Sequence, residues 1–395
     1  MLKQLLSHSS DLQRLLNEGF NLEIMESNLL IRQVPYVTSN KVVDRGILVS
    51  ELSTEGNKTI RPKDHVVFFV GSIPCDDQGR ELDKIINSRA SSPIGGGLVA
   101  CCTFSSKPQG GYPDYYEKMT SYVNILLGYA RAIDPTVTPS VYPPIATDDE
   151  DSPFQYIDSA SSRAQISAVT EKFKHKKIAI VGLGGTGSYI LDLIAKTPVQ
   201  YIHLYDEDIF YTHNAFRAPG AASIEELNAG QKKVEYFQSK YNPIHRNIVS
   251  HAVNIDESNV DELREMDFVF LAMDTSLVKK LIFEKLDEFC VPFIDTGMGI
   301  ELNQASSSLN GLIRTTTSIE NNRKHVWNRV SFLNLEDDEY ERNIQIADLN
   351  ALNAVLAVIK WKKLVGFYLD LDRELSSTFT IDGNHLLNED NQECI

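Results

Sequence analysis

The sequence contains little cysteine and no two cysteines in a C-x-x-C arrangement. Its five cysteines are Cys75, Cys101, Cys102, Cys290 and Cys394. Structural zinc sites are built from such closely spaced pairs, so no structural zinc is expected. An odd number of cysteines without a disulfide framework is typical of a reducing compartment, and we therefore expect a cytoplasmic protein.

Long apolar runs and an excess of positive charge are missing as well. No apolar stretch approaches the length that spans a bilayer, and the amino-terminal segment lacks the features of a signal peptide, so no membrane association is expected. Lys and Arg number 38 against 54 Asp and Glu, a net charge of −16. Such a chain is poorly suited to neutralising phosphates, so we expect no nucleic-acid partner.

A chain of 395 residues is long enough for two domains. Residues 132–153 contain five prolines and the acidic run from Asp148 to Asp151. Neither feature supports a continuous helix or strand, so this segment is predicted to be a linker. We place the boundary near residue 150. Residues 1–150 are predicted to form a smaller α+β domain of unassigned role, a candidate for partner binding, and residues 151–395 a second domain.

The second domain alternates strand patterns with helix patterns. Strands are expected at 177–181, 201–205, 249–253, 268–273 and 291–294, with helices at 188–196, 225–240 and 277–289. A late helix around 349–359 and a strand near 376–381 follow. Strands separated by helices of this length predict an α/β fold with a mostly parallel, Rossmann-like sheet covered on both faces.

The most informative segment directly follows the first of these strands. It reads G-L-G-G-T-G-S and contains Gly182, Gly184, Gly185 and Gly187. Glycines permit a tight turn and let backbone N–H groups approach a phosphate, and the start of the following helix favours an anion. Because the motif lies between a strand and a helix, it predicts nucleotide binding.

Asp206 ends the next strand, where a carboxylate accepts hydrogen bonds from ribose hydroxyls. Up to this residue, an NAD(P)- or FAD-dependent oxidoreductase fits the sequence equally well, and a non-catalytic nucleotide-binding scaffold is a third possibility. The residues that follow favour a triphosphate. Arg217 and Lys233 supply cations, and Asp274, after a strand, supplies a carboxylate suited to hold Mg²⁺.

The order of glycine loop, D-x-D, N-x-x-R, Lys and a strand-terminal Asp resembles that of the E1-like adenylating enzymes. This family includes the ThiF and MoeB types and the ubiquitin-activating enzymes. The likeness covers about residues 155–395. It implies a Rossmann-type fold, ATP with Mg²⁺ as cosubstrate, and a homodimer. The implied reaction joins the C-terminal Gly-Gly carboxylate of a ubiquitin-like or sulfur-carrier protein to the α-phosphate of ATP, which yields an acyl adenylate and pyrophosphate.

The resemblance also implies roles for individual residues. The four glycines of the loop, with Asn214, Arg217 and Lys233, surround the phosphates, and Asp206 binds the ribose. Asp274 holds the Mg²⁺. Arg163 is the candidate for an arginine that members of the family donate across the dimer. The residues expected to act in catalysis are Arg217, Lys233, Asp274 and Arg163.

The sequence departs from the family pattern at several positions. Ala218 and Thr275 stand where many relatives have Gln and Asn, and the two zinc-binding C-x-x-C pairs of many relatives are missing. No cysteine lies between residues 291 and 393, where transthiolating relatives keep their nucleophile. We therefore expect the activated acyl group to pass to a separate partner, with an E2-like protein as a candidate, in a bacterial conjugation-type pathway.

The cysteines are candidate acyl acceptors. Cys290 precedes an apolar strand pattern and is expected in the core, whereas Cys75 follows a proline in a turn and is expected to be exposed. At least one of the neighbours Cys101 and Cys102 is expected to face the core. Cys394 is expected in a frayed tail.

Overall fold

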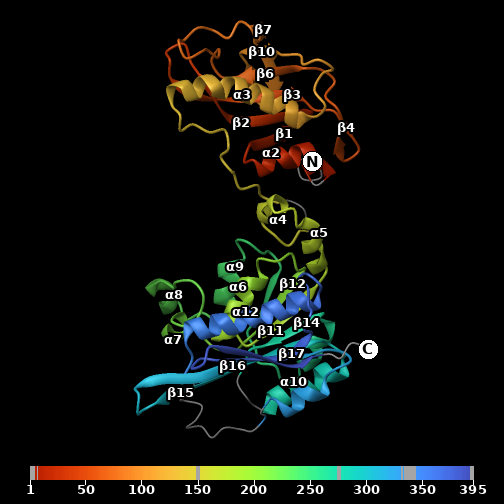
Figure 1. The fold of residues 1–395 in the computed structure, drawn as a ribbon, viewed down its shortest axis with the longest axis vertical. Helices are drawn as coiled ribbons and strands as arrows, with labels where there is room; N and C mark the ends of the chain where they lie inside the picture. Colours follow the sequence, from red (N-terminus) through yellow and green to blue (C-terminus); the bar gives the residue numbers. More distant parts are fainter. Residues whose placement is uncertain are drawn as a thin grey trace. The chain divides into compact units, whose positions relative to one another are not determined.

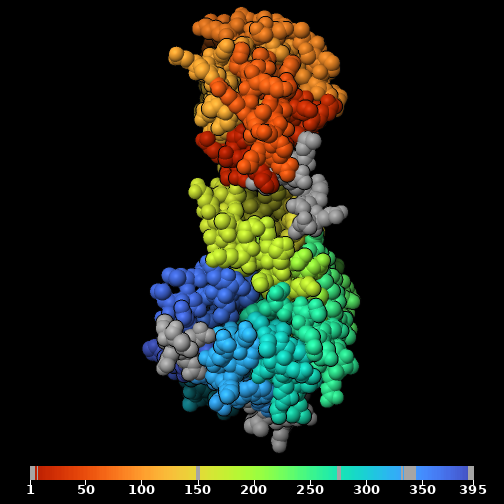
Figure 2. All heavy atoms as spheres, turned by 90° about the vertical axis from the view of Figure 1, so that its right-hand side faces the viewer, coloured from red at the N-terminus to blue at the C-terminus, as the bar shows by residue number. Residues whose placement is uncertain are grey.

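The computed structural model describes residues 5–6, 8–147, 152–273, 277–330, 332 and 344–391. Its contacts divide the chain into two compact units. The first comprises Met1–Asp149 with Ile157–Ala164, and the second comprises Glu150–Tyr156 with Gln165–Ile395. In Figure 2 the first unit is mainly red to orange, and most of the second is yellow-green to blue. The acidic run from Asp148 to Asp151 lies outside the described residues.

The first unit is built on an antiparallel sheet with the strand order β1-β2-β3-β6-β10-β7. In that order the strands are Asn21–Met25, Asn28–Val37, Val43–Glu51, Val66–Val70, Cys102–Ser105 and Ile86–Ser88. Two short hairpins, β4–β5 and β8–β9, connect them; their strands are Thr54–Glu55, Lys58–Thr59, Ser92–Gly95 and Leu98–Ala100. The predicted α+β character of this part is confirmed.

Helix α3 (Tyr115–Ile133) packs against β2 and β3 of this sheet (Figure 1). It begins at Asp114, whose side chain accepts a hydrogen bond of 2.8 Å from the N–H of Glu117 and so caps the helix. Met119 and Tyr122 recur at helical spacing and are fully buried against the sheet. The unit also contains the short helices α2 (Ser10–Asn17) and α4 (Ser159–Arg163).

The second unit contains an eight-stranded sheet with the order β13-β12-β11-β14-β15-β16-β17-β18. In that order the strands are Ile248–His251, Tyr201–Tyr205, Lys177–Val181, Phe268–Leu271, Phe293–Asn303, Ser308–Ser318, Glu374–Thr380 and His385–Asn391. Pairing is parallel from β13 to β15 and antiparallel from β15 to β18. In chain order the parallel strands lie 3-2-1-4-5, which is the Rossmann arrangement, and this confirms the predicted fold class.

Helices cover both faces of this sheet because the strand residues alternate between two cores. Ile178 and Ile180 of β11 face the core that includes α6 and α12, whereas Ala179 and Val181 face the core that includes α10. The helices are α5 (Ser167–Thr170), α6 (Gly185–Ile194), α7 (Thr212–Ala215), α8 (Ile224–Asn228), α9 (Lys233–Tyr241), α10 (Leu277–Glu288) and α12 (Ala347–Leu364). Short 3₁₀ turns lie at Glu171–Phe173, Val260–Glu265 and Lys324–Asn328.

Two elements differ from the sequence prediction. The helix expected at 225–240 is two helices, α8 and α9, because Gly230 between them has φ +59°, a left-handed conformation that glycine adopts easily. The strand expected at 291–294 continues to Asn303 as half of a long hairpin with β16. Over the described residues, no helix has both the length and the apolar character needed to cross a membrane.

Candidate active site

A cavity of about 780 Å³ lies at the carboxyl ends of the parallel strands in the second unit. Its walls come from the segments that follow β11, β12, β13 and β14, from the first half of β15, and from the start of α12. In a Rossmann sheet this is the edge where ligands bind, next to the point where the strand order reverses. Every lining residue belongs to the second unit.

The glycine loop forms one wall, and its geometry requires glycine at two positions. Gly182 has φ +88°, and a Cβ there would lie 2.5 Å from the carbonyl oxygen of Ala272. A Cβ at Gly187 would lie 1.9 Å from the carbonyl oxygen of Gly182. Helix α6 begins directly after Gly184, a residue with no side chain to cap it. Its first-turn N–H groups and the positive end of its dipole are therefore suited to a phosphate.

Asp206 is buried at the end of β12 and holds the loop in place. One carboxylate oxygen accepts a hydrogen bond of 2.7 Å from the N–H of Leu183, and the other accepts one of 2.9 Å from the N–H of Asp208. A carboxylate has about four acceptor positions, so capacity for a ribose hydroxyl remains. Its side chain also lines the cavity.

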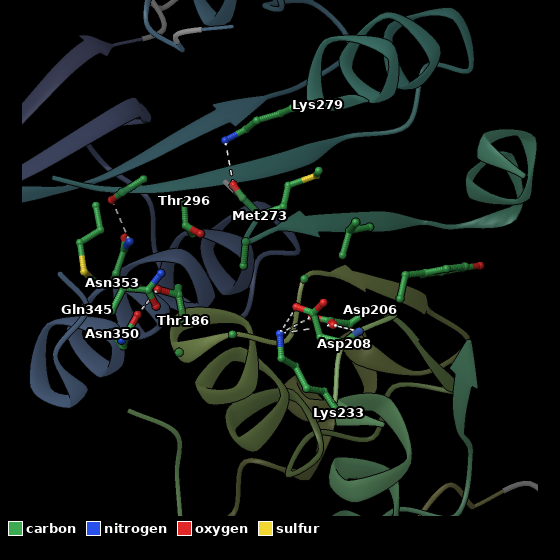
Figure 3. Close-up of a pocket in the computed structure, with 18 of the residues that line it drawn as sticks. Thr186, Asp206, Asp208, Lys233, Met273, Lys279, Thr296, Gln345, Asn350 and Asn353 are labelled. Atoms are coloured by element: carbon green, nitrogen blue, oxygen red, sulfur yellow. Dashed lines mark hydrogen bonds and ion pairs between the residues drawn. The ribbon is translucent and has the colours of Figure 1, made fainter. Parts of the chain in front are cut away.

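Lys233 is only 6% exposed and joins the two aspartates of the D-x-D motif. Its Nζ lies 2.6 Å from a carboxylate oxygen of Asp208 and 3.4 Å from the carboxylate of Asp206 (Figure 3). Arg217 lines the same part of the cavity. The pKa of neighbouring His213 is lowered, mainly by burial and further by the charges of Arg217 and Lys233, whereas the charge of Asp208 raises it.

The remaining predicted residues are placed differently. Asn214 is 2% exposed and does not line the cavity; its Oδ1 accepts a hydrogen bond of 2.8 Å from the N–H of Tyr211 and so fixes the start of α7. Arg163 ends α4 in the first unit, with its guanidinium 5.1 Å from the ring centre of Tyr142. Asp274 lies outside the described residues, although Met273 before it lines the cavity.

The structure thus brings together Gly182, Gly184, Gly185, Asp206, Arg217 and Lys233 around one cavity. Gly187 lies within the first turn of α6, behind the lining surface. In the described part of the chain, no group of three or more His, Cys, Asp or Glu side chains is arranged to hold a metal ion. A Mg²⁺ site at Asp274 therefore remains a prediction.

Sequence reasoning missed two asparagines of α12 that form the opposite wall (Figure 3). Asn350 Oδ1 accepts a hydrogen bond of 2.8 Å from the hydroxyl of Thr186, and a Cβ at Gly185 would lie only 2.1 Å from its amide nitrogen. Asn353 Nδ2 donates 3.0 Å to the carbonyl oxygen of Gly297. Both asparagines are 1% exposed. The sequence did offer one sign of them: these asparagines interrupt an otherwise apolar helix pattern, and buried amide side chains need hydrogen-bond partners.

A buried ion cluster beside the cavity was also missed. Asp295 of β15 is fully buried, and its carboxylate lies 2.6 Å from Lys279 Nζ and 2.9 Å from Arg314 Nη2. Both cations line the cavity. The sequence did offer one sign of this cluster: Asp295 lies in an apolar strand pattern, and a buried carboxylate is almost always paired with a cation.

The predicted cysteine environments are partly wrong. Cys290 is exposed, because it follows the end of α10 with φ +58° and its side chain points away from the core. Cys75 is only 1% exposed, since its N–H bonds to the carbonyl of Val37 and draws the turn against the sheet. Cys102 faces the core as expected, with its sulfur 3.7 Å from that of half-buried Cys101. Cys394 lies outside the described residues.

Comparison with known families agrees with this geometry. Residues 159–317 match the ThiF family, and residues 10–159 match a family described as Domain of unknown function (DUF6791). The second unit carries a ThiF family domain. The resemblance inferred from the order of the motifs is therefore confirmed.

Individual relatives of the ThiF family domain are distant. The adenylyltransferase and sulfurtransferase UBA4 of Saccharomyces cerevisiae is 27% identical over 135 residues, which are 33% of this chain and 30% of UBA4. The chain thus matches less than a third of the length of this curated relative. Among solved structures, E. coli MccB with ATP aligns with a TM-score of 0.44 and 17% identity over 59% of this chain and 69% of MccB. PaaA aligns with a TM-score of 0.44 and 16% identity over 56% of this chain and 75% of PaaA.

Proposed function

We propose that the ThiF family domain uses ATP to adenylate the C-terminal carboxylate of a ubiquitin-like or sulfur-carrier protein. The observation that carries the proposal is the pairing of a phosphate-binding loop with Arg217 and Lys233 at one cavity. A dinucleotide oxidoreductase needs the loop and a ribose-binding carboxylate but has no need for two cations beside the phosphates. An enzyme that acts on a triphosphate needs such cations, because they offset the negative charge of the phosphates as the reaction proceeds.

The residues of the cavity suit the proposed chemistry. The substrate carboxylate attacks the α-phosphorus of ATP, an acyl–phosphate bond forms, and the bond to the β-phosphate breaks with its electron pair leaving on pyrophosphate. Lys233 and Arg217 stabilise the negative charge on the transferring and leaving phosphates. Asp206 holds both the loop and the ribose. Because the attacking group is the carboxylate of the substrate, this step needs no side-chain nucleophile.

The remaining expectations belong to the same proposal. Asp274 is the proposed Mg²⁺ ligand, and the ion would offset charge on the phosphates. A homodimer, the donation of Arg163 across it, and transfer to an E2-like protein in a bacterial conjugation-type pathway also follow from the family resemblance. UBA4 is named as an adenylyltransferase and sulfurtransferase, which supports the adenylation step for this chain.

Lys233 and its neighbour Lys232 offer a matched test. Lys232 donates to the backbone carbonyl of Glu207 at the surface, whereas Lys233 lines the cavity. With a small protein ending in Gly-Gly as acceptor, the wild type should exchange labelled pyrophosphate into ATP. Lys233→Met should lower this exchange by about 10²-fold or more, and Lys232→Met should leave it within about twofold.

Two results would contradict the proposal. One is pyrophosphate exchange by Lys233→Met at the wild-type rate. The other is a wild type that binds NAD(P)H tightly and does not bind ATP. Circular dichroism of both lysine variants is the control for folding, since Lys233 also pairs with the buried carboxylate of Asp206 and the exposed carboxylate of Asp208.

A further inference from the structure

Cys101 and Cys102 form a pair of neighbouring thiols in the first unit, and the proposed adenylation does not use them. Their sulfur atoms lie 3.7 Å apart and are joined by an S–H···S hydrogen bond. Neither residue lines the cavity of the second unit. Two thiols in contact can exchange a proton and then a covalent bond, whereas a cysteine by itself needs a second molecule for that step.

The local backbone places both sulfur atoms on the same side. In a continuous strand, successive side chains point to opposite faces of the sheet. Strand β9 ends at Ala100 and β10 begins at Cys102, so Cys101 lies in the break between them. The N–H of Cys101 donates a hydrogen bond of 2.8 Å to the carbonyl of Phe69 in β6, which fixes this break against the sheet. The contact between the sulfurs is therefore built into the fold of the first unit.

The two thiols differ in access and in acidity. Cys102 is fully buried and Cys101 half-buried, so a dissolved reagent reaches Cys101 first. The pKa of Cys101 is lowered, mainly by the hydrogen bond from Cys102 and further by the N–H groups of Cys101 and Gly71, although burial opposes this shift. The same hydrogen bond, together with burial, raises the pKa of Cys102. Since the thiolate is the reactive form, Cys101 is suited to attack first and Cys102 to react second.

We propose that Cys101 and Cys102 form a redox site, which a peroxide converts to a disulfide between the two neighbours. The Cys101 thiolate attacks a peroxide oxygen; an S–O bond forms, the O–O bond breaks, and the departing hydroxide takes up the proton that Cys101 released. Cys102 then loses its proton and attacks the sulfur of Cys101. The S–S bond forms and the S–O bond breaks, so that water leaves. The pair gives up two electrons, and one hydrogen peroxide becomes two waters.

This disulfide should be easy to reduce and should disturb the sheet. Neighbouring Cα atoms lie about 3.8 Å apart across a trans peptide, whereas disulfides usually join Cα atoms about 4.4–6.8 Å apart. The backbone at the break must therefore adjust, and such a strained bond is reduced more readily than a structural disulfide. Strand β10 pairs with both β6 and β7, so the adjustment should reach the interior of the sheet (Figure 1).

Peptide mapping of the full-length wild type tests the proposal. The protein is treated with about one equivalent of hydrogen peroxide, unfolded, alkylated and digested with trypsin. The peptide of residues 90–118 contains both cysteines of the pair and no other. In about half or more of the molecules, this peptide should be two hydrogen atoms lighter and accept alkylation only after dithiothreitol. Cys290, which is exposed and has no neighbouring cysteine in the sequence, is the internal control and should stay open to alkylation.

Two variants separate the roles of the thiols. Cys102→Ala removes the second thiol, so oxidation of Cys101 should stop at the sulfenic acid, which dimedone traps. The first step should also slow about threefold at pH 7, because Cys101 loses the hydrogen bond that favours its thiolate. Cys101→Ala leaves only the buried thiol and should react about tenfold more slowly than the wild type. In the oxidised wild type, hydrogen exchange in β10 should be about fivefold faster than in the reduced protein.

An unchanged mass of peptide 90–118 in wild type whose Cys290 has been oxidised would overturn the proposal. A disulfide from Cys101 to any cysteine other than Cys102 would do the same. If Cys102→Ala did not fold, the mass of the wild-type peptide would still decide the question. The pyrophosphate exchange of Lys233→Met is measured without peroxide, so the proposed adenylation stands or fails independently of this redox site.

Discussion

At the scale of single residues, the site depends on positions where a side chain is sterically impossible or a charge must be paired. Gly182 and Gly187 bring loop backbone into contact with backbone, and Asp206 and Asp295 are each buried with a cation within reach. These constraints let backbone N–H groups face the cavity. They also make the effects of substitution predictable.

Gly187→Ala should destabilise the second unit by about 1–3 kcal/mol, because its Cβ would lie 1.9 Å from a backbone oxygen that has little room to move. Gly184→Ala is the matched control, since a Cβ there would meet nothing within 4 Å. Urea unfolding followed by tryptophan fluorescence measures the difference: both tryptophans, Trp327 and Trp361, lie in the second unit. Equal stability of the two variants would contradict the steric argument.

Asp295→Asn should lower the free energy of unfolding by about 3–5 kcal/mol, because it leaves the charges of Lys279 and Arg314 without their shared carboxylate. Lys279 is only 3% exposed, so solvent compensates little for the loss of this carboxylate. The same fluorescence-detected urea titration measures the loss. Asp382 is exposed, so Asp382→Asn is the control and should have the same urea midpoint of unfolding as the wild type. If Asp295→Asn were as stable as this control, the ion cluster would contribute little to stability.

At the scale of elements, the parallel strands bring polar residues to one edge of the sheet. The loops that connect the strands set the positions of these residues. His245 lies between α9 and β13 and joins two such loops: its Nε2 lies 3.0 Å from the carbonyl of Val199, and its Nδ1 accepts from the N–H of Asn247. The carbonyl can only accept, so the ring is neutral with its proton on Nε2. Burial lowers its pKa to about 4.

This histidine should make the second unit less stable in mild acid. The unfolded chain takes up a proton near pH 6.5 and the folded chain only near pH 4, so stability present above pH 6.5 is lost as the pH falls towards 4. The loss between pH 7.5 and pH 5 should be about 2 kcal/mol from His245 alone. In urea unfolding at both pH values, the loss of unfolding free energy between pH 7.5 and pH 5 should be about 2 kcal/mol smaller for His245→Gln than for the wild type. Equal losses would contradict a lowered pKa of His245.

At the scale of the whole molecule, the described cavity is confined to one unit. All residues that line the cavity belong to the second unit, and the first unit has its own hydrophobic core. Hydrogen exchange should therefore show slower exchange with ATP and Mg²⁺ in the glycine loop and at the D-x-D segment. Peptides from β2 and α3 of the first unit should exchange at unchanged rates. Equal protection of both units would show that the nucleotide acts beyond its cavity.

Much of the second unit followed from local patterns. The apolar runs of β11, β12 and β14 are short and bounded by turn residues, and the glycine loop requires a strand before it and a helix after it, so fold class and family were both predictable. The division of residues 225–240 into α8 and α9 could not be predicted, because a single glycine such as Gly230 can also lie within a continuous helix.

The sequence by itself determined the Rossmann-like fold class and most of the nucleotide half of the cavity, because that half is built from residues close to the glycine loop in a fixed motif order. Only the tertiary structure decided the other half. Asn350, Asn353, Asp295 and Arg314 meet through strand register and helix packing, and no local pattern specifies which distant side chains become neighbours. Among the described residues, β15 pairs with β14 only as far as Asp295 but with β16 as far as Asn303, and this difference is visible only once the strands are paired.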